Sequence, residues 1–168
     1  DVTEIEIIEN GNIFRGLKRG TVTTNDGIIL KADEFEYNKT SNILNASGNV
    51  EVVDKINNYL LYSKELTYIK NNETLISKGN SRVMIPNNNV IIEAEIFEYL
   101  KVENKIIAKN NVSINDKNNN NKLYSDLITY YKNEDKFITN GKTKAIIEDK
   151  YDFNSKDVIY LRKLNQLS

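Results

Sequence analysis

Charged residues recur at one position of this sequence, and their spacing decides what chemistry they could perform. Asp33, Lys64, Glu95 and Asp126 follow one another at equal steps along the chain. Carboxylates are the usual ligands of hard cations such as Ca²⁺, and a pair of carboxyl groups can hydrolyse a glycosidic bond. A metal site or a glycosidase centre is therefore the first chemistry to consider.

The regular spacing argues against both kinds of site. Catalysis needs one special site, whereas this column also holds Lys64 and Lys156 and runs along the whole chain. The chain has no His and no Cys, so the commonest general base and metal ligand, and any thiolate or disulfide, are missing. We interpret the column as exposed charges along neighbouring strands, and we predict no catalytic residue, no metal site and no cofactor.

Length, charge and hydropathy narrow the class further. The chain has 168 residues, about one domain's worth, and its 23 basic and 24 acidic residues give a net charge of -1. This balance gives no electrostatic reason to expect nucleic acid as a partner. Apolar runs stay far below the ~20 residues of a transmembrane helix, and the opening DVTEIEII lacks the pattern of a signal peptide. We expect a mature, soluble chain.

A 31-residue period runs through the sequence. Tyr37, Tyr68, Tyr99 and Tyr130 recur at this period, and Tyr160 follows one position early. Further columns keep the same step, with a fifth member one position early in three of them, which is too regular for chance and indicates a repeat protein. They comprise the small residues Ala32, Ser63, Ala94, Ser125 and Ser155, the apolar residues Phe35, Leu66, Phe97, Ile128 and Val158, the residues Leu44, Leu75, Ile106, Phe137 and Leu167, and the bend residues Gly48, Gly79, Asn110 and Gly141.

Within each unit apolar and polar residues alternate, which is typical of a β-strand. The alternation slips by one position between Ala32 and Phe35 and again in each later unit. A bulge or corner at the slip would keep both halves of the strand facing one interior, and Gly48 stands where the partner strand needs a tight bend. Short polar connections such as NKTSN suit antiparallel hairpins better than helical crossovers.

We therefore predict an all-β fold of kinked antiparallel strands, stacked into two facing sheets that join along one side like a half-open shell. The chain is a single domain over 1–168, with a half-repeat at 1–22, repeats near 28–52, 59–83, 90–114 and 121–145, and a partial repeat at 151–168. The interior is lined by rows of apolar side chains, namely Leu30, Phe35, Leu44, Leu61, Leu66, Leu75, Ile92, Phe97, Ile106, Leu123, Ile128 and Phe137.

Two other classes fit a repetitive β-chain. Rows of inward apolar residues usually fill a closed core, so a structural or adhesive β-solenoid stays open as an alternative. A carbohydrate-acting β-helix enzyme would also be repetitive, but it would carry charged residues that break the pattern in one or two adjacent coils. No such break stands out.

The unit KADEFEYNKTSNILNASGNVEV, residues 31–52, resembles the OstA-like repeat of the lipopolysaccharide-transport family. The resemblance has two parts. In the first, a small residue is followed by Asp or Glu, any residue, an apolar residue, any residue and Tyr. The second is the following Leu-x-Ala-x-Gly-Asn-Val. It covers essentially the whole chain, most clearly 28–114, and is looser over 115–168, where Thr143 and Ala145 replace the Val pair. The family comprises a periplasmic bridge protein, its membrane-anchored partner and the periplasmic domain of the outer-membrane translocon.

The resemblance implies a twisted, open β-jellyroll, or β-taco, that carries lipopolysaccharide across the periplasm of a Gram-negative bacterium without catalysis. The twelve inward residues would hold its acyl chains in an apolar groove, and ~0.8 kcal/mol per buried methylene would make the capture firm. Such proteins join end to end with each other or with further copies. The expected partner edges are therefore the outer strands near Ile5, Ile7 and Ile8 and near Val158 and Tyr160.

The resemblance also bears on which member of the family the chain is. EIEIIENGNIFRG and the later GTVTTNDGIILKADEFEY resemble the translocon's periplasmic domain more than the free bridge protein. Leu167 opens the second half of a repeat that stops at Ser168, so we expect the natural chain to continue into a C-terminal outer-membrane barrel. We predict association with the outer membrane, with the free periplasmic bridge protein as the alternative.

Overall fold

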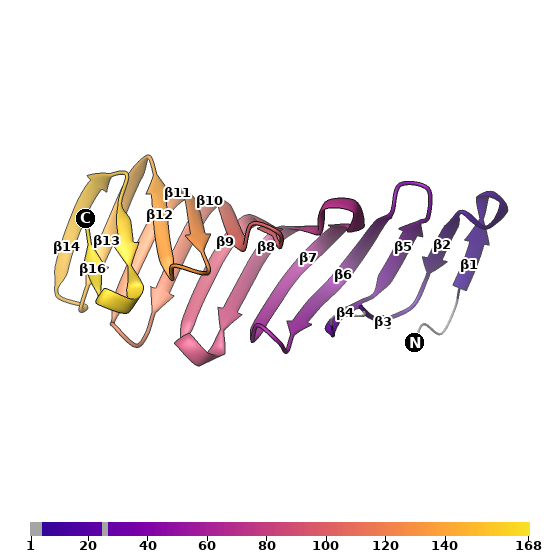
Figure 1. The fold of residues 1–168 in the computed structure, drawn as a ribbon, viewed down its shortest axis with the longest axis horizontal. Coiled ribbons are helices and arrows are strands. Elements are labelled where there is room, and N and C mark those ends of the chain that lie inside the picture. The colour runs from indigo at the N-terminus through magenta and orange to yellow at the C-terminus, as the bar shows by residue number, and fades with distance from the viewer. Residues whose placement is uncertain (1–4, 25–26) are drawn as a thin grey trace.

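The computed structural model describes residues 5–24 and 27–168, and these residues form sixteen strands of one sheet whose pairings are all antiparallel. Residues 1–4, the start of the predicted half-repeat, lie outside the described residues. Strands that are neighbours in sequence are mostly neighbours in space, so the chain runs from one end of a long, twisted stack to the other (Figure 1). No helix of the described residues is long and apolar enough to cross a bilayer.

The elements have the following bounds. The strands are β1 (Ile5–Ile8), β2 (Ile13–Gly16), β3 (Gly20–Thr23), β4 (Ile28–Ala32), β5 (Glu34–Asn38), β6 (Ile43–Asp54), β7 (Tyr59–Ile69), β8 (Thr74–Ile85), β9 (Val90–Leu100), β10 (Lys105–Asp116), β11 (Asn121–Tyr131), β12 (Lys136–Asn140), β13 (Lys142–Ile147), β14 (Tyr151–Lys156), β15 (Ile159–Leu161) and β16 (Gln166–Leu167). Short 3₁₀ turns are η1 (Glu9–Gly11), η2 (Lys70–Asn72), η3 (Pro86–Asn88) and η4 (Arg162–Leu164).

A crease divides the sheet lengthwise into two half-sheets. The pairing register of the long strands shifts near their centres, between Ser47 and Val50 of β6 and between Lys78 and Ser81 of β8. These shifts confirm the bulge predicted from the slip in alternation. The first half-sheet holds β1, β2, β5, β12, β15, β16 and one half of each long strand. The second half-sheet holds β3, β4, β13, β14 and the other halves.

Glycine lets neighbouring strands approach closely at the crease. Gly79 has a φ of +84°, and a Cβ atom at this position would lie 2.9 Å from the Cβ of Lys64. At Gly48 a Cβ atom would lie 2.6 Å from Oδ2 of Asp33. Real Cβ atoms avoid both distances, and only glycine adopts such backbone angles freely. Asp33 and Lys64 belong to the charge column, so this column follows the crease.

The two half-sheets enclose one apolar interior. Its buried core draws Phe97 and Phe137 from the first half-sheet and Ile92 and Leu123 from the second. The antiparallel all-β fold with a single creased sheet is therefore confirmed, because only facing half-sheets bury both sets of side chains together.

The side opposite the crease is the mouth, which is bounded by two rows of tight turns that we call lips. The first lip holds the turns 39–42, 70–73, 101–104, 132–135 and 162–165, and the second holds 55–58, 86–89, 117–120 and 148–150. Most turns end in a residue with left-handed backbone, which asparagine tolerates well. These residues include Asn42, Asn58, Asn89, Asn104 and Asn120.

Backbone hydrogen bonds tie each turn of the first lip to the turn before it. The first residue of a turn donates its N–H to the carbonyl of the residue that ends the preceding turn. These bonds run from Lys70 to Asn42 at 3.1 Å, from Lys101 to Glu73 at 3.3 Å, from Lys132 to Asn104 at 3.0 Å and from Arg162 to Asp135 at 3.1 Å. The lip is thus a ladder whose rungs repeat with the period of the sequence.

Candidate functional site

Members of the charge column lie at the crease. Asp33 accepts hydrogen bonds from Arg19 Nη1 at 3.0 Å and from Asn49 Nδ2 at 2.6 Å, on the exposed side of the crease. The part of the chain that the structure describes contains no group of three or more acidic residues that could hold a metal ion. The column has a local structural role, which is to cover the bends at the crease.

All twelve residues predicted to face inward lie in the interior. Ten are buried, and Leu44 and Leu75 are half-buried against the others. The interior is their shared location, and lipid binding by them remains a prediction.

The N-terminal half of the interior contains unfilled space. Two adjoining apolar cavities of about 50 and 40 Å³ lie between the half-sheets there, and both are bordered by Ile28, Val52, Leu75 and Tyr99. Each cavity has about the volume of one or two water molecules. An aliphatic chain would therefore enter only if the half-sheets parted or the bordering side chains rotated.

Six of the twelve predicted residues border these cavities, and the other six do not. The six at the cavities are Leu30, Leu44, Leu61, Leu66, Leu75 and Ile106.

The C-terminal half of the interior is filled by side chains. Phe137 is 0% exposed, and its ring stacks on Tyr130 at 4.4 Å and on Tyr160 at 6.0 Å between ring centroids. Phe97 and Ile128 are 1% and 2% exposed. Stacked rings of this kind contribute more than their buried area alone, so this half behaves as a closed core.

Arg162 closes the mouth over this filled half. Its Nη2 donates a 2.6 Å hydrogen bond to the carbonyl of Asn88 on the second lip, and its Nε lies 2.9 Å from Oδ2 of Asp116 at the end of β10. Nη1 donates to Oδ2 of Asp135 on the first lip at 3.3 Å. Burial disfavours the charge of Arg162, but the carboxylates of Asp116 and Asp135 outweigh it and raise the pKa above its ordinary value. We call this group the clasp.

Tyr160 extends the clasp into the interior. Its hydroxyl donates to Oδ2 of Asp116 at 3.0 Å and accepts from Nδ2 of Asn121 at 3.1 Å, and Asn121 also donates to Asn165 of the first lip at 2.7 Å. Burial, followed by the charge of Asp116, raises the pKa of Tyr160 to about 12. The hydroxyl therefore stays protonated and keeps donating at neutral pH.

Lys132 bridges the lips just N-terminal to the clasp. Its ammonium group lies 4.6 Å from the ring centroid of Tyr59 on the second half-sheet and donates to the hydroxyl of Tyr99 at 2.9 Å. Burial lowers the pKa of Lys132, although the nearby Asp54 opposes this shift. The mouth is thus bridged by polar contacts from Lys132 to the C-terminal end.

The predicted partner edges are partly corrected. The strand with Ile5, Ile7 and Ile8 is the outermost strand of the described residues and pairs only with β2. Val158 and Tyr160 do not lie at an edge, because β15 pairs with both β12 and β16 and both side chains are buried. The reason is the short hairpin through η4, which adds β16 outside β15.

The C-terminal edge of the second half-sheet is β14. Phe153 pairs with the buried Ala145 and thus points to the interior side, yet Phe153 is 50% and Tyr151 56% exposed. The apolar interior is uncovered at this end of the stack.

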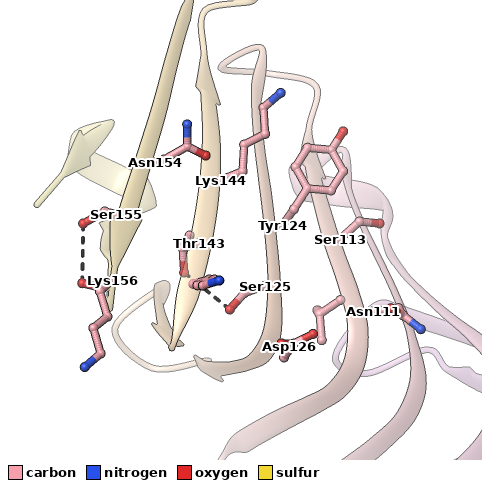
Figure 2. Close-up of a pocket in the computed structure, with 12 residues that line it drawn as sticks. Asn111, Ser113, Tyr124, Ser125, Asp126, Thr143, Lys144, Asn154, Ser155 and Lys156 are labelled. Carbon is pink, nitrogen blue, oxygen red and sulfur yellow. Dashed lines mark hydrogen bonds between the residues drawn. The ribbon is translucent and has the colours of Figure 1, made fainter.

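A groove of about 810 Å³ lies on the outer face of the second half-sheet and is lined mainly by residues with polar or charged side chains (Figure 2). Tyr124, Lys144 and Asn154 line it from neighbouring strands, with Lys156 and Asp126 near the crease. None of the twelve inward residues borders it. It is separate from the interior.

Comparison with known proteins bears on the fold. No family model matches the sequence, and no curated protein matches it significantly. The crystal structure of LptH from Pseudomonas aeruginosa, the LptA homologous periplasmic component of the lipopolysaccharide transport device, matches with a TM-score of 0.62. The match covers 68% of this chain and 82% of LptH, at 16% identity.

The chain has the fold of LptH. The twisted open β-jellyroll predicted from the sequence is thereby confirmed as the fold class. The TCP10 domain of Danio rerio CPAP, in complex with a STIL peptide, also matches over 91% of this chain at 10% identity, but its TM-score of 0.17 is too low to carry weight.

The clasp was missed at the sequence level, although two signals were present. Asp54 and Asp116 stand at inward positions of the alternation, where the other units have Ile85 and Ile147. A carboxylate at an inward position needs a buried partner, and Arg162 supplies one for Asp116.

Proposed function

We propose that this chain is a non-catalytic carrier of lipopolysaccharide in the periplasm, which holds acyl chains between its half-sheets. The observation that carries the proposal is the apolar interior, which contains two apolar cavities bordered by Leu75, Tyr99 and Ile28. The LptH-like fold and the OstA-like repeat support it. Each methylene transferred from water into this interior would contribute ~0.8 kcal/mol, while the sugar and phosphate groups stay in water at the mouth.

Within this role we propose the periplasmic domain of the outer-membrane translocon, continued by a barrel, with the free bridge protein as the alternative. The repeat sequence at 1–37 supports the first assignment. The ends of the stack would join other OstA-like proteins or a second copy by strand pairing, through β1 at one end and through β14 and β16 at the other.

A closed structural β-solenoid is the second candidate, and the filled C-terminal half favours it. Phe97, Ile128 and Phe137 leave no room for a ligand there. A solenoid of this kind would bind no lipid in either half.

Photocrosslinking of lipopolysaccharide decides between the two. A benzophenone amino acid at Leu75 faces the cavities, and one at the neighbouring Ile76 faces outward. A lipid carrier crosslinks at 75 and not at 76. If folded protein gives no crosslink at either position, the carrier function is wrong and the structural solenoid is the remaining candidate.

A further inference from the structure

A five-fold motif at the first lip is explained neither by the fold nor by the apolar interior. A tyrosine, one further residue and then a cation lead into five of the first-lip turns. Because side chains of a strand alternate, the cation projects from the same side as the inward tyrosine two positions before it. The motif occurs at Tyr37 to Lys39, Tyr68 to Lys70, Tyr99 to Lys101, Tyr130 to Lys132 and Tyr160 to Arg162.

The motif places five cations in one column along the mouth. Consecutive cations are separated by two strands of the sheet, or about 10 Å. Backbone hydrogen bonds fix this spacing, because each of the five cationic residues donates its N–H to the residue that ends the preceding turn, with Lys39 donating to Asn12.

The second lip lacks such a column. Its positions at the same 31-residue step are Lys55, Pro86, Lys117 and Glu148, of which two are cations. The cations of the first lip are therefore not a general property of the turns.

The partners of the cations change along the column. Lys39 is exposed and lies 4.4 Å from the ring centroid of Phe14, and Lys70 is exposed and makes no ion pair with any described residue. Lys101 lies 3.6 Å from Glu73. Lys132 lies beside Tyr59 and Tyr99, which border the cavities, and Arg162 lies over the filled half. Both are half-buried and engage the protein's own tyrosines or carboxylates. The two N-terminal cations of the column are thus exposed, whereas the three C-terminal ones are half-buried and engaged by the protein's own groups.

We propose that this column of cations, which we call the rail, binds the phosphate groups of lipopolysaccharide while the acyl chains of the lipid lie in the interior. This proposal rests on the function proposed above. An amphiphile inserted through the mouth puts its head group at the lips, and tyrosine, with an apolar ring and a polar hydroxyl, suits that boundary. Lysine binds phosphate as a point charge without a fixed orientation. Equal spacing then lets a head group pass from one cation to the next as the lipid advances.

At the closed half, the rail and the clasp share Arg162. A phosphate that reaches Lys132 and Arg162 competes with the carboxylates of Asp116 and Asp135 for the guanidinium group. Arginine binds phosphate and carboxylate in the same forked geometry, so the exchange keeps the charge of Arg162 compensated while the lips separate.

The test compares two double variants with the same change in charge. Lys39→Gln with Lys70→Gln removes two exposed rail cations, and Lys55→Gln with Lys117→Gln removes two exposed lysines from the second lip. Binding is measured with lipopolysaccharide and with phosphatase-treated lipopolysaccharide, at low and at high salt. We expect the rail variant to bind native lipopolysaccharide about tenfold more weakly, with a smaller salt dependence, and the control within about twofold. Treated lipid should bind both variants equally.

The rail would be overturned if the two double variants lost the same affinity for native lipopolysaccharide. It would also be overturned if the rail variant lost as much affinity for phosphatase-treated lipid as for native lipid. Crosslinking at Leu75 separates this result from failure of the carrier function. If the unmodified chain crosslinks at 75 while the variants do not differ, lipid capture stands and the rail is wrong. If the unmodified chain captures neither lipid, the carrier function fails and the rail with it.

Discussion

Arg162 donates a 2.6 Å hydrogen bond to the carbonyl of Asn88, a residue 74 positions earlier in the chain, and so joins the two lips of the mouth. The same side chain is 11% exposed and ion-pairs with Asp116, whose side chain is 0% exposed. Lips joined in this way hold the filled half shut, whereas the N-terminal cavities are bordered on the first lip by Glu73 and Lys101. One creased sheet thus contains an open and a closed compartment.

Replacing Arg162 with Met should destabilise the fold strongly. The change leaves two buried carboxylates, Asp116 and Asp135, without their cation, which typically costs about 3–5 kcal/mol. Urea unfolding measures this loss. Arg82→Met is the matched control, because Arg82 is exposed and lies 3.7 Å from Glu93, and removal of such a surface pair costs less than about 1 kcal/mol. Equal losses in the two variants would show that the clasp contributes nothing special.

Replacing Tyr160 with Phe should loosen the clasp without removing a charge. The variant lacks the hydroxyl that joins Asp116 to Asn121, and it should lose about 1–2 kcal/mol. The chain has no Cys, so Ile128→Cys provides a single thiol in the filled half. We expect maleimide to modify this thiol several-fold faster in the Tyr160→Phe background, while Leu75→Cys at the cavities reacts at an unchanged rate. A uniform acceleration at both thiols would point to general loosening of the fold.

Alkaline pH should weaken the clasp in a defined range. The pKa of Tyr160 is about 12 in the folded chain, mainly because of burial, and near 10 in an unfolded chain. A raised pKa means that the contribution of Tyr160 is complete below pH ~10 and is lost as the pH rises toward 12. The difference in unfolding free energy between the native chain and Tyr160→Phe should therefore shrink between pH 10 and 12. A difference that stays constant over this range would rule out the buried, donating hydroxyl.

Two glycines at the crease allow the cost of backbone strain to be separated from the cost of a steric clash. Gly79 and Gly141 have φ values of +84° and +87°, but only at Gly79 would a Cβ atom meet a neighbour, 2.9 Å from the Cβ of Lys64. Left-handed backbone costs an alanine about 1–2 kcal/mol at either position. We expect Gly79→Ala to lose at least about 1 kcal/mol more than Gly141→Ala in urea unfolding. A larger loss at Gly141 would contradict the close approach of the strands at the crease.

The fold could be predicted from the sequence because its period and alternation are local features of the chain. The slip near Ala32 and the glycine at position 48 fix where each strand bends, and the register shift between Ser47 and Val50 lies where they placed it. The terminal edge could not be predicted in this way. Whether Tyr160 ends a half-sheet depends on η4, a short turn over Arg162–Leu164 that brings β16 back beside β15.

The sequence also could not predict that one half of the interior contains cavities while the other half is filled. Leu75 and Phe137 belong to the same 31-residue column and look equivalent in sequence, yet Leu75 borders the cavities and Phe137 is fully buried. The difference arises from partners far away in the chain, such as Asp116 and Tyr160, which are 44 residues apart. A repeat pattern describes what its units share, whereas the clasp depends on how they differ.

The open half gives the sharpest test of lipid capture. Leu75 is half-buried at the cavities, so Leu75→Asp can keep its carboxylate near the mouth while it makes the lining polar. Phe97→Asp is less informative, because Phe97 is 1% exposed and an unpaired carboxylate there should unfold the chain. Ile76→Asp is the control, since Ile76 neighbours Leu75 on the outward face and pairs with Glu98 and Thr67.

We expect Leu75→Asp to reduce lipopolysaccharide binding at least about tenfold, because several methylenes lose their apolar surroundings at ~0.8 kcal/mol each. Ile76→Asp should bind within about twofold of the native chain. Both variants should unfold cooperatively in urea, which shows that the comparison concerns binding and not folding. If a folded Leu75→Asp variant captured the lipid as well as Ile76→Asp does, the acyl chains would not pass between Leu75 and Tyr99, and the cavities at the mouth would have no part in transport.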